Sequence, residues 1–251
     1  MPRLIIDSGG PRCRLQLLPD APPRGLTRGA RQMYTNIWKQ MQNDRASWFK
    51  LELVLYANFS PDDLFVTLTY AGNVPAYWRD TKSNVPAFMR RYRRQLAAEG
   101  LPAPRYVYVH EALHGDGRPH HHMVLSAAGD DAARIAQCWP HGSVDVESIR
   151  EFGGYQKLAK YITKEPREKG KPVPGERMWT PSRNLIRPEH IVEQVPADYR
   201  LAAPDGAQPL ADGMQISQRL ESDFGGAVQR LDFILPQKTN IAYNILSRYH
   251  V

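Results

Sequence analysis

The amino-acid sequence predicts an α+β fold, in which short strands and helices alternate along the chain. Three observations support this prediction. Segments rich in β-branched and aromatic residues recur between residues 64 and 149, close to glycine, proline and aspartate turn signals. Between them, apolar residues repeat at three- and four-residue steps, which is typical of one face of a helix. The glycine-rich stretch Gly115-Asp116-Gly117 separates two strand-like segments and predicts a hairpin.

The N-terminal region, residues 1–59, is predicted to be a basic arm followed by a helix. The first 30 residues contain five arginines and five prolines, and only Leu4-Ile5-Ile6 indicates a short strand. From about Ala30 to Phe59 a helical period predicts one long helix or two shorter ones, carried by Met33, Ile37, Met41, Trp48, Leu51 and Leu55.

The middle of the chain, residues 60–166, carries most of the predicted elements. Strands are expected at residues 64–70, 105–112, 119–125 and 142–149, and helices near residues 86–98, 131–139 and 153–165. In the first of these helices we expect three core residues, Phe88, Tyr92 and Leu96, and four outward-pointing arginines, Arg90, Arg91, Arg93 and Arg94. In the last helix, one stripe consists of Tyr155, Leu158, Ala159 and Ile162, and the opposite side carries Lys157, Lys160, Tyr161 and Lys164.

The C-terminal region, residues 167–251, is predicted to be an extension that begins with a basic, proline-rich linker at about residues 166–188. The sequence has no GxxxxGK[ST] motif, so nothing indicates an attached helicase or ATPase.

Composition sets broad limits on the class of protein. The 251 residues are 42% hydrophobic, enough for a core, and no apolar run or leader pattern indicates a membrane span or export. The two cysteines, Cys13 and Cys138, lie far apart and indicate no disulfide framework, which fits a reducing cytoplasm. The formal net charge of +7 favours a polyanionic partner.

The stretch from Arg118 to Leu125 predicts a metal site. Side chains alternate along a strand, so His120 and His122 share one face, and two such imidazoles can bind a single metal ion. The hairpin places Glu111 close to His120. A metal held by two histidines and a carboxylate, with open positions, can act as a Lewis acid on a phosphoryl oxygen. Alternatively, the histidines are solvated turn residues and Glu111 pairs with an arginine.

Tyr161 is a candidate nucleophile, because the lysines around it should favour the phenolate over the phenol, whose reference pKa is about 10. Attack on a DNA phosphodiester would join the protein to one strand end and conserve the bond energy for rejoining. The alternative is a tyrosine that only forms a hydrogen bond at a helix surface.

Three motifs in this order resemble the HUH endonuclease family, and within it the rolling-circle replication initiators of small phages and plasmids. They are Phe65-Val66-Thr67-Leu68-Thr69-Tyr70, Arg118-Pro119-His120-His121-His122 and Tyr161-Ile162-Thr163-Lys164. In that family they correspond to an FxTLT-like strand, a His-x-His metal site and a YxxK helix with the catalytic tyrosine. The likeness covers about residues 60–166, which would be the nuclease core.

The resemblance implies an antiparallel central sheet flanked by helices, similar to RNA-recognition domains. His120, His122 and Glu111 would hold Mg²⁺ or Mn²⁺, and Tyr161 would form a 5′-phosphotyrosine and release a 3′-hydroxyl. Lys164 would contact the phosphate or assist the metal site. Charge alone, and not the resemblance, makes further residues candidates for DNA binding: Lys157, Lys160, Arg90, Arg91, Arg93 and Arg94. The alternative for the arginines is a solvated helix face. Many such phage initiators carry a second tyrosine four residues earlier, but this position is Lys157, so a single-tyrosine mechanism is expected.

The predicted function is therefore that of a site-specific endonuclease and strand transferase, which initiates rolling-circle replication on single-stranded DNA at an origin. Host helicase and polymerase would be its partners in the cytoplasm of a bacterial cell, and no interaction with a membrane is expected. Two alternatives remain open: a single-strand transposase or conjugative relaxase with the same chemistry, or a non-catalytic nucleic-acid-binding protein that contains a metal.

Overall fold

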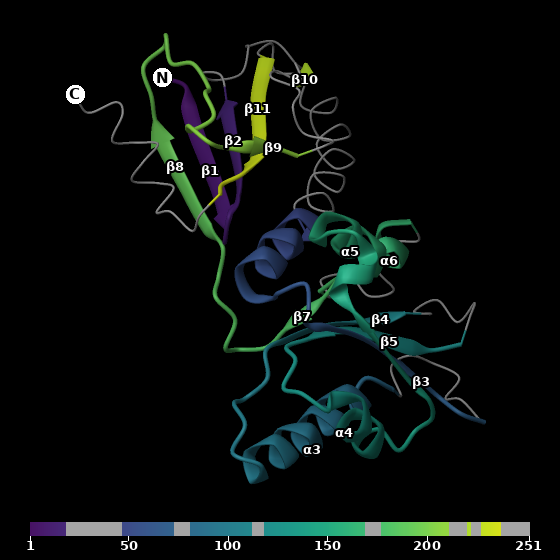
Figure 1. The fold of residues 1–251 in the computed structure, drawn as a ribbon. Helices are drawn as coiled ribbons and strands as arrows, with labels where there is room; N and C mark the ends of the chain where they lie inside the picture. Colours follow the sequence, from purple (N-terminus) through teal and green to yellow (C-terminus); the bar gives the residue numbers. More distant parts are fainter. Residues whose placement is uncertain are drawn as a thin grey trace. The chain divides into compact units, whose positions relative to one another are not determined.

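The α+β prediction is confirmed by a computed structural model of the chain (Figure 1). The structure describes residues 1–18, 47–72, 81–111, 118–168, 177–210, 220–221 and 227–236. These residues form two compact units, and the helical segment 47–58 contributes residues to both. Each unit contains its own antiparallel sheet.

The unit that carries the three motifs is built on a five-stranded sheet of order β6-β3-β5-β4-β7. Its strands are β3 (Leu64–Thr69), β4 (Tyr106–Glu111), β5 (His120–Leu125), β6 (Val144–Ser148) and β7 (Thr180–Pro181). All four strand pairs are antiparallel. The antiparallel central sheet implied by the resemblance is therefore confirmed.

Helices cover both faces of this sheet. Figure 1 shows α3 (Asn84–Ala98) and α4 (Asp131–Cys138) on one side, and α5 (Tyr155–Ile162) and α6 (Lys164–Glu168) on the other. On the α3 side, the predicted core residues Phe88, Tyr92 and Leu96 are buried against the sheet residues Val66, Leu68, Met123 and Leu125. Burial of this apolar stripe explains why the segment is helical, and its four arginines, which are good helix formers, favour the same structure.

Two buried aspartates connect this core to the loops around it. The carboxylate of Asp63 accepts hydrogen bonds from the backbone N–H groups of Ser60 and Ala127, at 2.8 Å each. The carboxylate of Asp131 accepts one from the hydroxyl of Tyr92 at 2.5 Å and one from the backbone N–H of Ala128 at 2.8 Å. Asp63 thereby ties the turn before β3 to the chain that leaves β5.

The other unit is a six-stranded sheet of order β10-β11-β2-β1-β8, with β9 paired to β11. It consists of β1 (Arg3–Gly9), β2 (Arg12–Leu18), β8 (Glu189–Gln194), β9 (Gln208–Pro209), β10 (Leu220–Glu221) and β11 (Ala227–Ile234). The turn between β1 and β2 needs Gly10, which has a φ of +56°, and a Cβ there would lie 2.4 Å from the carbonyl oxygen of Tyr56.

The two faces of this second sheet differ in chemistry. One buries apolar side chains, among them Leu4, Ile6, Cys13, Leu15, Leu231 and Phe233. On the other, Arg12 and Arg14 approach the same oxygen of the buried Asp232, at 2.5 Å and 2.8 Å, and Arg230 pairs with its second oxygen. Strands from both ends of the chain are therefore joined by an ion-pair cluster.

Two predictions outside the middle of the chain are wrong. Residues 3–18 are a β-hairpin and not a basic arm with one short strand, because each strand finds a partner far along the chain: β8 for β1 and β11 for β2. The linker expected at residues 166–188 is part of a sheet at residues 180–181, since β7 pairs with β4 and Ser182 hydrogen-bonds to the backbone of Tyr106.

Other helix predictions are met only in part. The helix expected from Ala30 to Phe59 is described at residues 47–58, which are helical, and its earlier part lies outside the described residues, as does the turn at residues 115–117. The helix expected at residues 153–165 is divided at Thr163 into α5 and α6, and Pro166 lies within α6 instead of ending the helix. Among the described helices, none is long and apolar enough to cross a membrane.

Candidate active site

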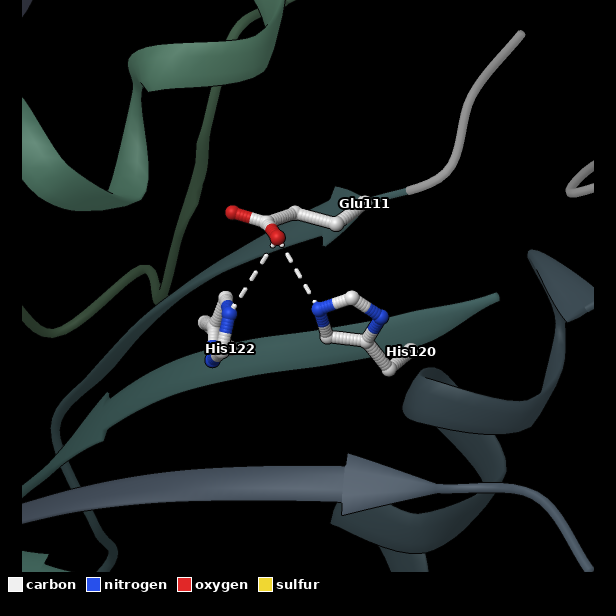
Figure 2. A group of neighbouring side chains, drawn as sticks. All are labelled: Glu111, His120 and His122. Carbon is white, nitrogen blue, oxygen red and sulfur yellow. Dashed lines mark ion pairs between the residues drawn. The ribbon is translucent and has the colours of Figure 1, made fainter. Parts of the chain in front are cut away.

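The β4–β5 hairpin brings Glu111, His120 and His122 together on the face of the sheet opposite α3. Glu111 lies directly across from His120 in the strand register, and His122 is the next residue of β5 on the same face. The Oε2 atom of Glu111 is 2.9 Å from Nε2 of His120 and 3.4 Å from Nε2 of His122 (Figure 2). One potential ligand atom from each residue lies within 4.8 Å of the others.

The contacts of Nδ1 in the two imidazoles favour metal binding by Nε2, the nitrogen that faces Glu111 in each ring. Nδ1 of His120 lies 2.9 Å from the carbonyl oxygen of Arg118, and Nδ1 of His122 lies 3.1 Å from the hydroxyl oxygen of Thr67. A carbonyl oxygen can only accept, so Nδ1 of His120 donates to it. Such outer contacts orient metal-binding histidines in many proteins. The buried Nε2 of His122 has no hydrogen-bond partner among the described residues, as a ligand nitrogen would require. The donor set therefore fits a divalent cation.

The protonation states of this group depend on the short contacts within it. Burial would raise the pKa of Glu111, but the two histidines outweigh it and lower the pKa to about 2. The hydrogen bond to Glu111 raises the pKa of His120 above its ordinary value. Without a metal, the carboxylate and His120 therefore stabilise each other as an ion pair, and a cation that binds here must displace the proton of His120.

Tyr161, on α5, lies beside the histidines. The centroid of its ring is 5.6 Å from that of His122, 6.0 Å from that of Phe65 and 5.7 Å from that of Phe152. The residue is 47% exposed, so its hydroxyl is accessible from solvent while one side of its ring rests on aromatic neighbours. The fold thus brings the candidate nucleophile and the candidate metal ligands together.

The predicted effect of the lysines on Tyr161 is wrong. The pKa of Tyr161 is raised, first by burial and then by the negative charges of Glu111 and Glu147. Lys160 does not lower it, and its ammonium group lies instead over the ring of Trp48, 5.1 Å from the ring centroid. Spacing along the helix placed lysines next to Tyr161 but could not show that two carboxylates approach it from the sheet.

Tyr155 has a different environment from Tyr161. It is partly buried, and its hydroxyl donates a hydrogen bond of 2.5 Å to the backbone carbonyl of Phe59. The same side of α5 buries Leu158, Ala159 and Ile162 completely or nearly so. Tyr155 therefore helps to fix the helix against the core, in agreement with the predicted core stripe.

The predicted DNA-binding residues lie on two faces of the sheet. Lys157 and Lys164 are exposed on α5 and α6, near Tyr161. The arginines lie on α3, across the sheet (Figure 1). Arg91 is partly buried and donates to the carbonyl of Cys138 at 2.8 Å. The other three arginines are exposed, and the Cζ atom of Arg93 lies over the ring of Tyr106, 5.3 Å from the ring centroid. The structure does not bring the arginines together with the candidate ligands.

Three neighbours of the site had no assigned role in the sequence. Phe65 stacks on His122 with ring centroids 5.1 Å apart, and it meets Phe152 edge-to-face at 4.6 Å. Glu147 lies opposite Phe65 in the register of β3 and β6, on the same face. The alternation of side chains along β3 and β6 could have indicated Phe65 and Glu147, but Phe152 lies in a 3₁₀ turn that follows no strand period.

The opposite face of β5 carries a second polar network. His121 is fully buried and contacts the hydroxyl of Tyr70 at 2.8 Å and Nδ1 of His110 at 2.7 Å, and Asn84 donates to Tyr70 at 3.0 Å. Burial, followed by the neighbouring histidines, lowers the pKa of His121 to about 2. His121 is therefore a neutral core residue.

Comparison with known proteins identifies the part of the chain that carries this site. Residues 63–166 match the model of the family "Replication-associated protein ORF2/G2P". Comparisons with curated proteins and with solved structures gave no match. The matched span contains β3 to β6 and α3 to α5, and with them all the candidate ligands and Tyr161. Residues 63–166 are thus similar to a replication-associated family, and the resemblance to replication initiators is confirmed at that level.

Proposed function

We propose that this protein is a metal-dependent endonuclease and strand transferase that initiates rolling-circle replication through a covalent bond between Tyr161 and DNA. One observation carries the proposal: the ring of Tyr161 lies 5.6 Å from the ring of His122, at the group formed by Glu111, His120 and His122. That this constellation lies within the span of a replication-associated family supports the assignment to replication initiation.

Glu111, His120 and His122 would hold a divalent cation, with Mg²⁺ or Mn²⁺ as the candidates. A cation bound there would supply Lewis-acid polarisation of the scissile phosphate and would neutralise charge that develops on its oxygens. Neighbouring groups of the protein contact the two imidazoles that would bind the cation. Nδ1 of each imidazole has a polar contact outside the group, with the hydroxyl of Thr67 or the carbonyl of Arg118, and Phe65 stacks on the ring of His122.

Tyr161 is the nucleophile in this proposal. Its hydroxyl oxygen forms a bond to the phosphorus of a DNA phosphodiester, and the bond from phosphorus to the 3′-oxygen breaks. Because Tyr161 is 47% exposed, its proton can pass to water, and the departing 3′-oxygen takes up a proton from water. The products are a 5′-phosphotyrosine and a 3′-hydroxyl, and the reverse reaction rejoins the strand.

The basic residues would act as DNA contacts in two places. Lys157 and Lys164, exposed on the helices that carry Tyr161, would contact phosphates beside the scissile bond. Arg90, Arg91, Arg93 and Arg94 would contact a different stretch of DNA, because α3 covers the opposite face of the sheet. A host helicase and polymerase in a bacterial cytoplasm would use the opened strand and its 3′-hydroxyl.

The test is formation of a covalent adduct between the full chain and labelled single-stranded oligonucleotides that include candidate origin sequences. Wild type, Tyr161→Phe and Tyr155→Phe are incubated with Mn²⁺, Mg²⁺ or EDTA, and the products are separated on a denaturing gel. We expect a slowly migrating adduct with wild type and with Tyr155→Phe, only with metal, and none with Tyr161→Phe.

Other outcomes would contradict the proposal in different ways. An adduct with Tyr161→Phe but none with Tyr155→Phe would assign the nucleophile to Tyr155. Binding of the oligonucleotides by all three proteins, without any adduct, would favour a non-catalytic nucleic-acid-binding protein. Joining of strands at transposon ends or transfer origins, and not at a replication origin, would keep the chemistry and change the biological role.

A further inference from the structure

The two candidate histidine ligands are held in different ways. His120 is 29% exposed at its side chain and its Nδ1 contacts a backbone carbonyl, that of Arg118. His122 is 5% exposed and its Nδ1 contacts a side chain, the hydroxyl of Thr67, at 3.1 Å. A backbone carbonyl cannot be removed by a substitution and has one hydrogen-bonding role. The orientation and tautomer of His122 depend instead on one replaceable hydroxyl.

Thr67 is placed for this contact by the sheet register. It lies directly across from His122 in the pairing of β3 with β5, on the same face of the sheet. Phe65, two residues earlier on this face, stacks on the His122 ring with centroids 5.1 Å apart. The ring therefore cannot turn freely away from Thr67, and Nε2 points toward Glu111.

The tautomer matters because a neutral imidazole has one nitrogen that donates and one with a free electron pair, and only the second can bind a metal. When Nδ1 of His122 donates to the hydroxyl of Thr67, Nε2 carries the free pair. The buried Nε2 forms no hydrogen bond within the part of the chain that the structure describes; its polar neighbour is Oε2 of Glu111, which lies 3.4 Å away and pairs more closely with His120, at 2.9 Å.

We propose that Thr67 is a positioning residue of the metal centre, which fixes His122 in the Nδ1–H tautomer with Nε2 directed at the cation. The inference rests on the proposed function, since it assumes that the group binds metal. It goes beyond that function by assigning a role to a threonine that contacts a candidate ligand and is not itself a candidate ligand. It also gives the two histidine ligands different properties: the ring of His122 is held in one orientation, and the ring of His120 is more exposed to solvent.

The chain offers a matched control for this role. Thr69 lies on the same strand and the same face, directly across from His120, and is partly exposed like Thr67. Among the described residues, no hydrogen bond to the hydroxyl of Thr69 is found, and His120 uses the carbonyl of Arg118 instead. Thr69→Val therefore removes a hydroxyl from an equivalent position without removing a contact to a ligand.

The experiment measures Mn²⁺ binding by the full chain, from the electron paramagnetic resonance signal of free Mn²⁺, for wild type, Thr67→Val, Thr67→Ser and Thr69→Val. Loss of an outer contact of this type typically weakens metal binding about 10- to 100-fold. We expect Thr67→Val to weaken Mn²⁺ binding by about tenfold or more, and Thr67→Ser and Thr69→Val to stay within about threefold of wild type. Thermal unfolding in EDTA should show all four proteins folded.

A second readout does not depend on metal or activity. ¹H–¹⁵N spectra of the metal-free protein report which nitrogen of His122 carries the proton. We expect the Nδ1–H tautomer in wild type and in Thr67→Ser, and its loss in Thr67→Val. If Thr67→Val does not fold, the tautomer in wild type and Thr67→Ser decides the question alone, and an Nε2–H tautomer there overturns the inference.

The remaining outcomes separate this inference from the proposed function. If wild type binds Mn²⁺ and folded Thr67→Val binds it equally well, Thr67 is not a positioning residue although the metal site stands. If Thr69→Val loses as much affinity as Thr67→Val, the effect belongs to strand β3 in general and the inference is also wrong. If wild type binds no Mn²⁺, the metal site fails, and the role of Thr67 fails with it.

Discussion

Glu111 and His120 lie directly opposite each other on the two strands of one hairpin, and their Oε2 and Nε2 atoms are 2.9 Å apart. The pairing holds the candidate metal group together when no cation is bound, because each residue stabilises the charged form of the other. The pKa of Glu111 is about 2, and that of His120 lies above its ordinary value.

Glu111→Gln should lower the pKa of His120 toward its ordinary value of 6.5, since the hydrogen bond to the carboxylate is the largest cause of the raised pKa. The measurement is a pH titration of the His120 ring resonance in the metal-free protein by NMR. The titration of His141, which responds to burial and to Arg91, should not change. A His120 pKa that is equal in wild type and variant would contradict the 2.9 Å contact.

Asp63→Ala should destabilise the unit that contains β3 and β5 by about 2 kcal/mol, because the backbone N–H groups of Ser60 and Ala127 lose their hydrogen bonds to this buried carboxylate. The neighbouring Asp62→Ala is the control. Asp62 is 76% exposed and pairs with the exposed Arg150, so its loss should cost less than about 1 kcal/mol. Urea denaturation at pH 7 measures both. Equal losses for the two variants would show that Asp63 is not the connection between the turn and β5.

The stability of the second sheet should depend on pH through Asp232. Burial would raise its pKa, but Arg14, Arg12 and Arg230 lower it from 3.8 to about 2. Because the carboxylate is stabilised in the folded state, it adds about 2 kcal/mol to the free energy of unfolding above pH 4. This contribution is lost as the pH falls toward 2.

The corresponding measurement is urea denaturation between pH 2 and pH 5, with a signal from the second sheet. Asp232→Asn should destabilise the protein at pH 7 by about 3 kcal/mol, since removal of one partner leaves buried arginines unpaired with a carboxylate. The variant should also show a weaker dependence on pH in the acid range. A pH dependence identical to that of wild type would mean that another carboxylate is responsible.

The two groups of basic residues should have separable effects on DNA. Lys157→Ala/Lys164→Ala removes two positive charges near Tyr161, and Arg90→Ala/Arg94→Ala removes two from α3. Binding to single-stranded DNA weakens as salt rises, and the measured quantity is the slope of the logarithm of the binding constant against the logarithm of the salt concentration. If both groups contact phosphates, each double variant should reduce the size of this slope by about 1.4. Only the lysine variant should slow adduct formation at saturating DNA. Equal slowing by both variants would contradict the placement of the arginines on the opposite face of the sheet.

Much of the candidate site followed from sequence because it is local. Eight residues separate Glu111 from His120, and a hairpin over so short a distance has a register that the turn and the alternation of side chains largely determine. The same alternation separated His120 and His122 from the buried His121. The helical period likewise identified Phe88, Tyr92 and Leu96 as core, because burial of an apolar stripe needs no distant information.

The second sheet could not be read from the sequence in this way. Its strands are short, several of them are largely polar, and β2 pairs with a strand more than 200 residues further along the chain. Local propensity contains no information about which distant segment is the partner. The arm and the linker were therefore predicted where the structure has strands.

The sequence by itself determined most elements between residues 64 and 162 and which side chains share a face of β5, since both depend on periods of a few residues. Only the tertiary structure decided that Tyr161 lies against His122 and Phe65, that the arginines of α3 lie across the sheet, and that Thr67 contacts His122. It also reversed the expected pKa shift of Tyr161. The physical reason is that charge and burial act through space, and the carboxylates of Glu111 and Glu147 influence Tyr161 from two different strands of the sheet.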